Sequence, residues 1–354
     1  MLETLINDLA AARHLSDDQI RLAVGQLVDE AVAPATKADF LCRLALKGET
    51  IGEIAAFARA LREKSIQPPL DAETRAREIL DVVGTGGDRM NTFNISTTVA
   101  LICAAAGVAV AKHGNRAVTS QCGSADVIEA LGIRIDLPPE EAAQSLRERG
   151  FAFFFAPKYH PAFKGVVAAR KLCAERGQRT IFNFLGPLLN PARPSAQLLG
   201  VPRPELCEPL GRVLQSLGVR RGMVVCGEVR SEKGEARDGV QGHLDELSTL
   251  GGNTIAEFYR ENSFISSVLS ADNFPLQPAA LADLAGGDRA ANAEIVRRIL
   301  RGQECGPRRD AVLLNASAAL FVAARTRSLA AGWELAADLI DSGQALEKLN
   351  ELAE

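Results

Sequence analysis

Two glycine-rich turns carry the residues best suited to binding phosphate. The first, residues 84–88 (GTGGD), follows the apolar run 79–83, and the second, residues 112–116 (KHGNR), follows the apolar run 108–110. Each turn precedes a segment with helical periodicity, and a helix N-terminus offers backbone N–H groups and partial positive charge to an anion. The two turns together predict a ligand with two phosphate groups at opposite ends.

Polar side chains accompany the first turn. Asp88 places a carboxylate beside the expected phosphate position. The residues at the start of the next helical pattern are also polar, namely Thr92, Asn94, Ser96 and Thr97. Capping of the helix N-terminus accounts for one or two of these side chains. Because it does not account for all five beside three glycines, ligand binding is the favoured interpretation.

The second turn combines positive charge with hydrogen-bonding side chains. Lys112 and Arg116 bring charge to a strand end, where an anion gains most from it. Asn115 can both donate and accept hydrogen bonds, whereas His113 fits a buried core position and a ligand contact equally well. Hydroxyl groups follow near the next helix start, on Ser120 and Ser124.

A carboxylate pair and one arginine are further candidates. Asp245 and Glu246 are adjacent in a mostly apolar stretch. Carboxylate oxygens suit Mg²⁺, which commonly bridges carboxylates and substrate phosphates. Beside two phosphate-binding turns, a metal site and an exposed acidic turn explain the pair about equally well. Arg170 lies on a helical pattern with several lysines, for which a solvated face is the default interpretation.

The bulk composition limits the class of protein. The 354 residues include 47% hydrophobic and 24% charged residues, which is typical of a globular protein, and the net charge of −4 provides no global basic field for nucleic acid or anionic membrane. Seven scattered cysteines without CxxC spacing predict reduced thiols and disfavour zinc. Without a signal-peptide pattern or a long apolar stretch, we expect a cytoplasmic protein with no membrane and no nucleic-acid partner.

Hydrophobic periodicity divides the chain near residue 70. Residues 1–66 show only helical spacing, and residues 67–70 (QPPL) form a proline-rich break. From residue 79 onward, short apolar runs alternate with helical patterns, which is typical of a parallel sheet with crossover helices. The predicted fold is α/β, with a small all-helical N-terminal domain and a larger α/β domain whose central, mostly parallel sheet is flanked by helices.

The expected elements place both glycine turns at the carboxyl ends of strands, where such sheets bind ligands. Residues 157–173 have a helical pattern, and strand–helix units resume between 197 and 225. Residues 229–242 are charged and contain glycine without an apolar period, which predicts an exposed, mobile loop. Amphipathic helices are expected at residues 291–300, 310–325 and 333–353.

In their order and content, these motifs resemble the anthranilate phosphoribosyltransferase family of tryptophan biosynthesis. Besides the two turns, the resemblance rests on residues 94–97 (NIST), 123–127 (GSADV), 157–161 (PKYHP), 183–187 (NFLGP), 244–246 (LDE) and 309–316 (RDAVLLNA). It covers nearly the whole chain, and the combination is highly specific. The resemblance implies transfer of the phosphoribosyl group of 5-phosphoribosyl 1-pyrophosphate (PRPP) to the amine of anthranilate, which releases pyrophosphate.

The resemblance also assigns roles to residues. It implies that PRPP is held by Gly84, Gly87, Asp88, Thr92, Asn94, Ile95, Ser96, Thr97, Lys112, His113, Gly114, Asn115, Arg116, Ala117, Val118, Thr119, Ser120 and Ser124. Two Mg²⁺ ions would be bound by Ser96, Asp245 and Glu246. Asn115 and Arg170 would contact anthranilate, with Arg170 facing its carboxylate. Lys112 and Asp88 would be catalytic, and Lys112 would help Mg²⁺ to stabilise the departing pyrophosphate.

For the architecture, the resemblance implies a helical domain at residues 1–70, onto which some helices from about 158–190 pack, and a PRPP-binding α/β domain at 75–354. The helical domain would mediate a homodimer. Two alternatives remain open. A pyrimidine nucleoside phosphorylase-like enzyme would use phosphate as nucleophile without a paired Mg²⁺ site, and Asp245, Glu246 and Arg170 argue against it. A noncatalytic nucleic-acid-binding relative would need a basic groove, which the net charge disfavours.

Overall fold

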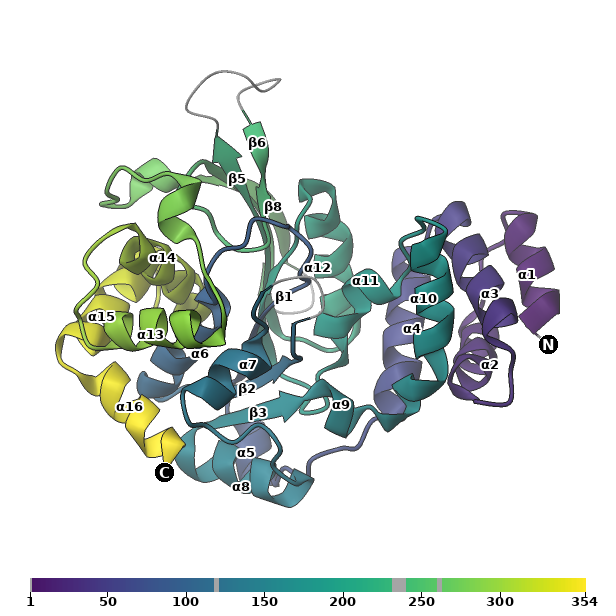
Figure 1. Cartoon of the computed structure of the whole chain (residues 1–354), viewed down its shortest axis with the longest axis horizontal. Coiled ribbons are helices and arrows are strands. Elements are labelled where there is room, and N and C mark those ends of the chain that lie inside the picture. The colour runs from purple at the N-terminus through teal and green to yellow at the C-terminus, as the bar shows by residue number, and fades with distance from the viewer. Residues whose placement is uncertain (1, 118–120, 231–239, 260–262) are drawn as a thin grey trace.

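The computed structural model describes residues 2–117, 121–230, 240–259 and 263–354. A bundle of helices lies beside a larger body that is built on a sheet (Figure 1). In these described ranges, each helix is too short or too polar to cross a membrane. The candidate site residues of both glycine turns belong to the larger body.

The bundle begins with α1 (Leu2–Ala10), α2 (Asp17–Val28), α3 (Pro34–Lys47) and α4 (Ile51–Glu63). Local signals fix two of these starts, because Ser16 and Gln19 form a capping box at α2, and Thr50 and Glu53 form one at α4. Capping boxes satisfy backbone N–H groups that a helix start leaves free. Pro34 opens α3, at a position where its missing N–H costs nothing.

Later segments of the chain pack onto this bundle. The 3₁₀ helix η1 (Pro161–Val166) contacts α2, and α10 (Val167–Glu175) contacts α3. Figure 1 shows α10 beside α3 and α4. Leu41 and Phe57 of the bundle share one apolar core with residues of α12 (Cys207–Ser216), which in turn packs on the sheet. The bundle and the sheet are therefore joined by buried contacts.

The sheet has eight strands, in the order β3-β2-β1-β4-β5-β7-β8, and β6 pairs with β5. The strands are β1 (Ile79–Gly84), β2 (Ala109–Gly114), β3 (Phe151–Phe155), β4 (Ala196–Gly200), β5 (Arg221–Arg230), β6 (Val240–Leu244), β7 (Gly252–Tyr259) and β8 (Phe264–Ser270). The first five in the sheet order are parallel, whereas β6, β7 and β8 pair antiparallel. The predicted fold class is confirmed.

Helices cover both faces of the sheet. One face, which includes Val82 and Phe153, packs in a single core with α6 (Ile95–Ala105), α7 (Ser124–Ala130), α13 (Arg289–Leu300), α14 (Pro307–Val322), α15 (Leu329–Asp341) and α16 (Gln344–Ala353). On the other face, α8 (Pro139–Arg149) covers β2 and β3, and α12 covers β5 and β7. Because both faces are covered, the parallel strands are apolar along most of their length.

Short helices complete the chain between these elements. They are α5 (Ala72–Ala76), α9 (Ala156–Tyr159), α11 (Phe182–Leu185), η2 (Gly186–Leu189), η3 (Pro204–Leu206), η5 (Ala271–Asn273) and η6 (Leu281–Leu284). Two predicted helices are divided. The one at 157–173 consists of α9, η1 and α10, because Pro161 cannot continue a helix. The one at 333–353 is divided between α15 and α16 at Gly343, whose φ is 83°.

The predicted loop at 229–242 needs a correction. Its two ends are strands, because Val229 on β5 pairs with Gly242 on β6. Residues 231–239 lie outside the described part of the chain. The sequence patterns assigned no element to residues 252–270, where β7 and β8 lie. β8 is hard to predict because it is an edge strand whose serines and apolar residues are both exposed.

Candidate active site

The first glycine turn lies at the carboxyl end of β1. Thr85 N–H donates a hydrogen bond to the carbonyl of Gly200, at the end of the neighbouring strand β4, over 2.9 Å. Gly86 and Gly87 have φ angles of 73° and 88°. Glycine enters this left-handed region without steric cost. The backbone of the turn therefore requires glycine at 86 and 87 in addition to any role in binding.

Gly84 and Gly200 leave room for Asp245, the first for its carboxylate and the second for its backbone. Gly84 on β1 pairs with Gly200 on β4. A Cβ atom at Gly84 would lie 2.5 Å from Asp245 Oδ2, and one at Gly200 would lie 1.5 Å from the Asp245 carbonyl oxygen. Neither position can carry a side chain while Asp245 keeps its place. Gly84 is a predicted phosphate contact to which the structure adds this packing role, and Gly200 joins the site unpredicted.

Three carboxylates gather at this strand end. Asp245 Oδ2 accepts a hydrogen bond from Gly86 N–H at 2.6 Å, and Glu246 Oε1 accepts one from Ser96 N–H at 3.2 Å. Asp245 N–H donates to Asp88 Oδ2 at 3.5 Å. The structure thus brings together the glycine turn, the start of α6 and the acidic pair. Backbone N–H groups that were expected to hold phosphate bind the protein's own carboxylates here.

Burial and crowding shift the pKa values of the acidic pair. Burial is the main cause that raises the pKa of Asp245 well above its ordinary value, and the charges of Asp88 and Glu246 raise it further. Burial also raises the pKa of Glu246 to about 7, against the opposing charge of Lys112. The cluster holds more negative charge than its surroundings neutralise, which favours binding of a cation.

Lys112 is the positive charge that faces this cluster. The residue is 1% exposed, and its Nζ donates to the Val82 carbonyl at 2.7 Å and to Ser96 Oγ at 3.5 Å. Burial lowers the pKa of Lys112, whereas the charges of Asp81 and Glu246 raise it. Strand β2 therefore brings a buried amine to the start of α6, next to the acidic pair.

The donor set fits a Mg²⁺ site that a ligand completes. Among the described residues, no group of three or more His, Cys, Asp or Glu side chains is arranged to hold a metal ion. Asp245, Glu246 and the Ser96 hydroxyl provide oxygen ligands, and Mg²⁺ usually takes waters and substrate phosphates at its other positions. The pair is therefore suited to a metal ion that binds together with a phosphorylated substrate.

Two polar atoms at the start of α6 make no hydrogen bond. Asn94 is the N-cap residue, yet its side chain forms no capping bond. Within the described part of the chain, its Oδ1 and the Oγ1 of Thr97 are buried without a partner. Buried polar atoms are nearly always hydrogen-bonded in folded proteins. Capping therefore does not explain Asn94 and Thr97, and binding of a ligand or of water remains.

The other predicted contacts near the first turn have structural roles. Ile95 is 1% exposed and belongs to the main apolar core. Thr92 forms an isolated β-bridge with Ala285. Thr92 lies between the turn and α6, whereas Ile95 is the first residue of α6 and its side chain points into the protein.

The second turn has its charges already paired. Arg116 forms ion pairs with Glu129 at 2.9 Å and with Asp126 at 3.0 Å, both on α7. Asp126 Oδ2 also accepts hydrogen bonds from the N–H groups of Ala117 and Gly123, at 3.0 Å each. The α7 carboxylates therefore hold both the arginine and the turn. Three predicted contacts of this turn lie outside the described residues, namely Val118, Thr119 and Ser120.

Asn115, Gly114 and Ser124 lie close together where β2 meets α7. Ser124 Oγ donates to the Asn115 carbonyl at 3.5 Å, and a Cβ atom at Gly114 would lie 2.2 Å from that hydroxyl. Asn115 Oδ1 accepts from the Arg116 N–H at 2.8 Å. Gly114 therefore permits the close approach of α7 to the strand end.

His113 is a buried residue, which answers the question that the sequence left open about its environment. It is 5% exposed, and its Nε2 lies 3.2 Å from Nε2 of His160, which is 3% exposed. Burial, followed by the nearby His160, lowers the pKa of His113 to about 3. Burial likewise lowers the pKa of His160 to about 4. Both rings are therefore neutral at pH 7.

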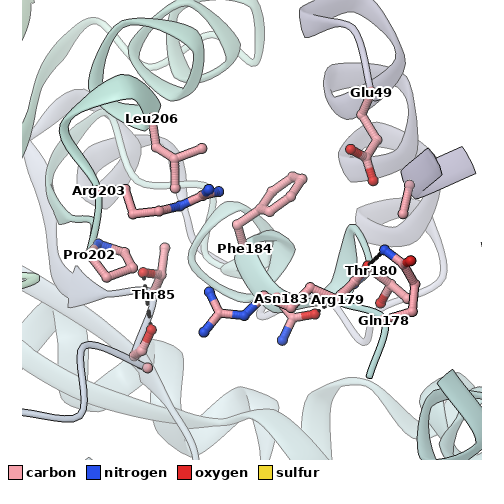
Figure 2. Close-up of a pocket in the computed structure, with 13 residues that line it drawn as sticks. Glu49, Thr85, Gln178, Arg179, Thr180, Asn183, Phe184, Pro202, Arg203 and Leu206 are labelled. Atoms are coloured by element: carbon pink, nitrogen blue, oxygen red, sulfur yellow. Dashed lines mark hydrogen bonds between the residues drawn. The ribbon is translucent and has the colours of Figure 1, made fainter. Parts of the chain in front are cut away.

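A pocket of about 350 Å³ lies between the first glycine turn and the helical bundle. Residues 85–87 form one wall, and Glu49 of the bundle contributes to another. In Figure 2, Arg203 and Leu206 lie on one side of the pocket and Glu49 on the other, with Phe184 between them. Apart from the first glycine turn, the sequence indicated only the NFLGP motif among the residues that line this pocket. Glu49 and Arg203 carried no local signal, because only the folded chain brings them to the turn.

Arg170 comes shortly before the lining residue Gln178 in the sequence, but it is not itself one of the residues that line the pocket. It is exposed on α10, and its guanidinium carbon lies 5.5 Å from the centre of the Phe182 ring. Phe182 opens α11, whose next residues, Asn183 and Phe184, do line the pocket. The structure therefore places Arg170 beside the pocket-forming segment.

Comparison with known proteins identifies the class to which this arrangement belongs. Residues 76–346 match the model of the glycosyl transferase family, a/b domain, and residues 3–65 match the model of the helical bundle domain of the same family.

Relatives of known name narrow the class. The anthranilate phosphoribosyltransferase of Geobacter sulfurreducens is 43% identical over 99% of this chain and 98% of its own length. The crystal structure of the Thermus thermophilus enzyme of that name has a TM-score of 0.85 and 40% identity, with 98% of each chain covered. The Saccharomyces cerevisiae enzyme, solved in complex with PRPP and Mg, has a TM-score of 0.83 and 26% identity, with 99% of this chain and 96% of that chain covered. The chain therefore belongs to the anthranilate phosphoribosyltransferase family.

Proposed function

We propose that this protein transfers the phosphoribosyl group of PRPP to the amine of anthranilate, which gives N-(5-phosphoribosyl)anthranilate and pyrophosphate in tryptophan biosynthesis. The observation that carries the proposal is that Glu246 and Lys112 meet at Ser96, at the start of α6, while Asp245 is bonded to the adjacent glycine turn. This arrangement combines metal-binding oxygens with an amine suited to phosphate oxygens. The names of the relatives support the same reaction.

The reaction needs positioning and charge stabilisation more than a nucleophilic side chain. The bond between C1 of the ribose and the pyrophosphate oxygen breaks, and the anthranilate nitrogen forms a bond to C1 from the opposite face. The amine is neutral at pH 7 and loses a proton to solvent after attack. In its protonated form, Lys112 stabilises the charge that develops on the departing pyrophosphate, because it is buried and already in place.

The remaining site residues divide between the two turns. Gly84, Gly87, Asp88 and the start of α6 contribute to one side of the PRPP site, and Asp88 also accepts from the Asp245 backbone. Residues 112–120 and Ser124 contribute to the other side. Ser96, Asp245 and Glu246 would hold two Mg²⁺ ions, which when bound offset the negative charge of pyrophosphate. Asn115 and Arg170 would contact anthranilate, and Arg170 lies against Phe182, which adjoins the pocket beside the first turn.

The architecture proposed from the sequence accompanies this function. It has a helical domain at residues 1–70, with helices from about 158–190 packed on it, and a PRPP-binding domain at 75–354. We further propose a cytoplasmic homodimer that forms through the helical domain. Leu22 and Leu46 support this contact, because they are 52% and 68% exposed on the bundle and would be buried against a second copy.

A fluorescence assay tests the proposed reaction. Anthranilate fluorescence is followed with PRPP present, with Mg²⁺ added in one sample and chelated in the other, and pyrophosphate is measured at the end. We expect Mg²⁺-dependent loss of the signal with one pyrophosphate released per anthranilate consumed. An unchanged signal from folded protein would refute the proposal. Phosphate-dependent cleavage of pyrimidine nucleosides, or salt-sensitive binding of single-stranded DNA, would then identify the alternative class.

A further inference from the structure

Two cysteine thiols from distant parts of the sequence meet inside the helical bundle. Cys42 Sγ on α3 and Cys173 Sγ on α10 are 3.6 Å apart, although 131 positions separate them along the chain. Cys173 is 1% exposed, whereas Cys42 is half-buried and reaches solvent. Sulfur atoms in a disulfide are about 2.05 Å apart, so a shift of the two side chains would join helices that already pack together.

The surroundings give the two thiols different reactivity. Arg176 donates to Asp39 Oδ1 at 2.6 Å, and Cys42 is the more exposed of the two thiols. An oxidant reacts with a thiol that it can reach, and reaction proceeds through the thiolate form. Cys173 instead lies against the Ala38 carbonyl, and burial raises its pKa to about 12. Cys42 is therefore the thiol that an external oxidant reaches first, and Cys173 is its internal partner.

We propose that Cys42 and Cys173 form a disulfide when the protein meets a peroxide, so that α10 is tied to α3 by a redox-sensitive bond. The Cys42 thiolate attacks hydrogen peroxide and becomes a sulfenic acid, with hydroxide released. The Cys173 thiol then attacks the sulfenic sulfur, the S–S bond forms and water leaves. In sum, two thiols are oxidised, one peroxide is reduced, and two waters form.

The bond would act on the segment that carries Arg170. Arg170 lies three residues before Cys173 on α10, hence on nearly the same side of the helix. A tie at Cys173 restricts movement of Arg170 relative to the pocket-forming segment at α11. We therefore expect oxidation to change the KM for anthranilate by about 3-fold or more, while the KM for PRPP changes less. This kinetic consequence rests on the proposed function, whereas formation of the bond does not.

Peptide mapping tests bond formation directly. The full-length protein, with Cys305→Ser to remove an exposed thiol, is treated with hydrogen peroxide, unfolded in N-ethylmaleimide and digested with trypsin. Cleavage after lysine and arginine gives residues 38–43 (ADFLCR) and 172–176 (LCAER), each with one cysteine. We expect these peptides as one cross-linked species, which dithiothreitol separates.

Matched variants and a second readout decide the outcome. We expect Cys42→Ser and Cys173→Ser each to remove the cross-link. In protein that keeps both cysteines, loss of two free thiols after peroxide, with no further change in the thiol count, supports the proposal. Recovery of both peptides alkylated after peroxide, or oxidation of Cys42 to sulfinic acid without cross-linking, would overturn it. The peptide map and the thiol count are both made on protein that retains Cys42 and Cys173, so a serine variant that fails to fold leaves the decision intact. A cross-link in a protein without transferase activity would refute only the proposed function.

Discussion

The two glycine turns end neighbouring strands, but they balance charge in opposite ways. Around the first turn, Asp88, Asp245 and Glu246 crowd together against one buried amine, and burial raises the pKa of two of these acids. Around the second turn, Arg116 is neutralised by Glu129 and Asp126. The first turn has negative charge to be neutralised, whereas the second has a cation that is already paired.

This difference assigns the turns different tasks in binding. The first turn gains stability when positive charge is added, so a metal ion and a phosphorylated ligand are expected to bind there together. On the proposed assignment, the second turn exchanges protein ion pairs for ligand oxygens. Exposed ion pairs contribute only about 0–1 kcal/mol, so this exchange costs little. Four variants separate these tasks, beginning with the largest expected effect.

Removal of the amine at the first turn should cost the most activity. We expect Lys112→Met to lower kcat about 10²- to 10³-fold, because a preorganised charge is lost where the pyrophosphate departs. Lys37→Met is the matched control, since Lys37 is equally buried but donates to the Asp29 and Gly165 carbonyls inside the bundle. Steady-state kinetics and thermal unfolding of both variants measure the effect. Equal losses of kcat in the two variants would contradict the role of Lys112.

A side chain at Gly200 should disturb the acidic pair through the backbone. Because a Cβ atom there would lie 1.5 Å from the Asp245 carbonyl oxygen, we expect Gly200→Ala to lower the free energy of unfolding by about 3 kcal/mol and to abolish Mg²⁺-dependent activity. Gly25→Ala in α2, where no atom lies within 4 Å of the new Cβ, should leave both unchanged or raise stability by up to about 1 kcal/mol. Denaturant unfolding compares the two, and a tolerated Gly200→Ala would show that Asp245 can move freely.

His113, which is buried in the second turn, and its partner His160 should make the free energy of unfolding depend on pH. The pKa values of His113 and His160 are lowered to about 3 and about 4, so the unfolded chain binds protons below pH 6.5 that the folded chain does not. Each histidine therefore removes stability as the pH falls from 6.5 toward its folded pKa, by about 2 kcal/mol at pH 5. His160→Gln should reduce the fall in unfolding free energy between pH 7 and pH 5 by about this amount. His14→Gln, at a side chain 67% exposed, should not.

Release of Arg116 should have the smallest effect. Glu129 holds the Arg116 guanidinium through two hydrogen bonds, at 2.9 and 3.0 Å. We expect Glu129→Gln to lower the KM for PRPP about 2- to 5-fold with kcat unchanged, since an exposed ion pair no longer competes with the ligand. Glu141→Gln breaks a comparable exposed pair with Arg134 and should leave the KM unchanged. A higher KM in Glu129→Gln would mean that the pair prepares the turn for binding.

Local patterns predicted the parts of the site that lie next to one another in sequence. The apolar run before each glycine turn gave β1 and β2, and the polar residues after residue 91 gave the start of α6. Asp245 and Glu246 were candidates because two acids stand side by side in an apolar stretch. In each case, the hydrophobic periodicity or the charged residues of one short stretch of sequence were sufficient for the prediction.

Contacts between distant segments could not be predicted in this way. Gly200 belongs to the site because the Asp245 backbone packs against it on β4. Glu49 belongs to the site because it lines the same pocket as the first turn. The environment of His113 depends on His160, and that of Arg116 on α7. A single sequence does not show which distant residues will be in contact or how far apart they will lie. For these residues, local patterns therefore gave either no signal or two equally good interpretations.

We propose that the acidic pair and PRPP share a divalent cation. Calorimetric titration of PRPP into the protein, with Mg²⁺ or with a chelator, tests it most directly, and an Asp245→Asn, Glu246→Gln double variant is titrated in parallel. We predict binding that requires Mg²⁺ in the wild type and is weakened at least about 100-fold in the variant. Equally tight binding of PRPP in chelator, or by the double variant, would contradict the claim.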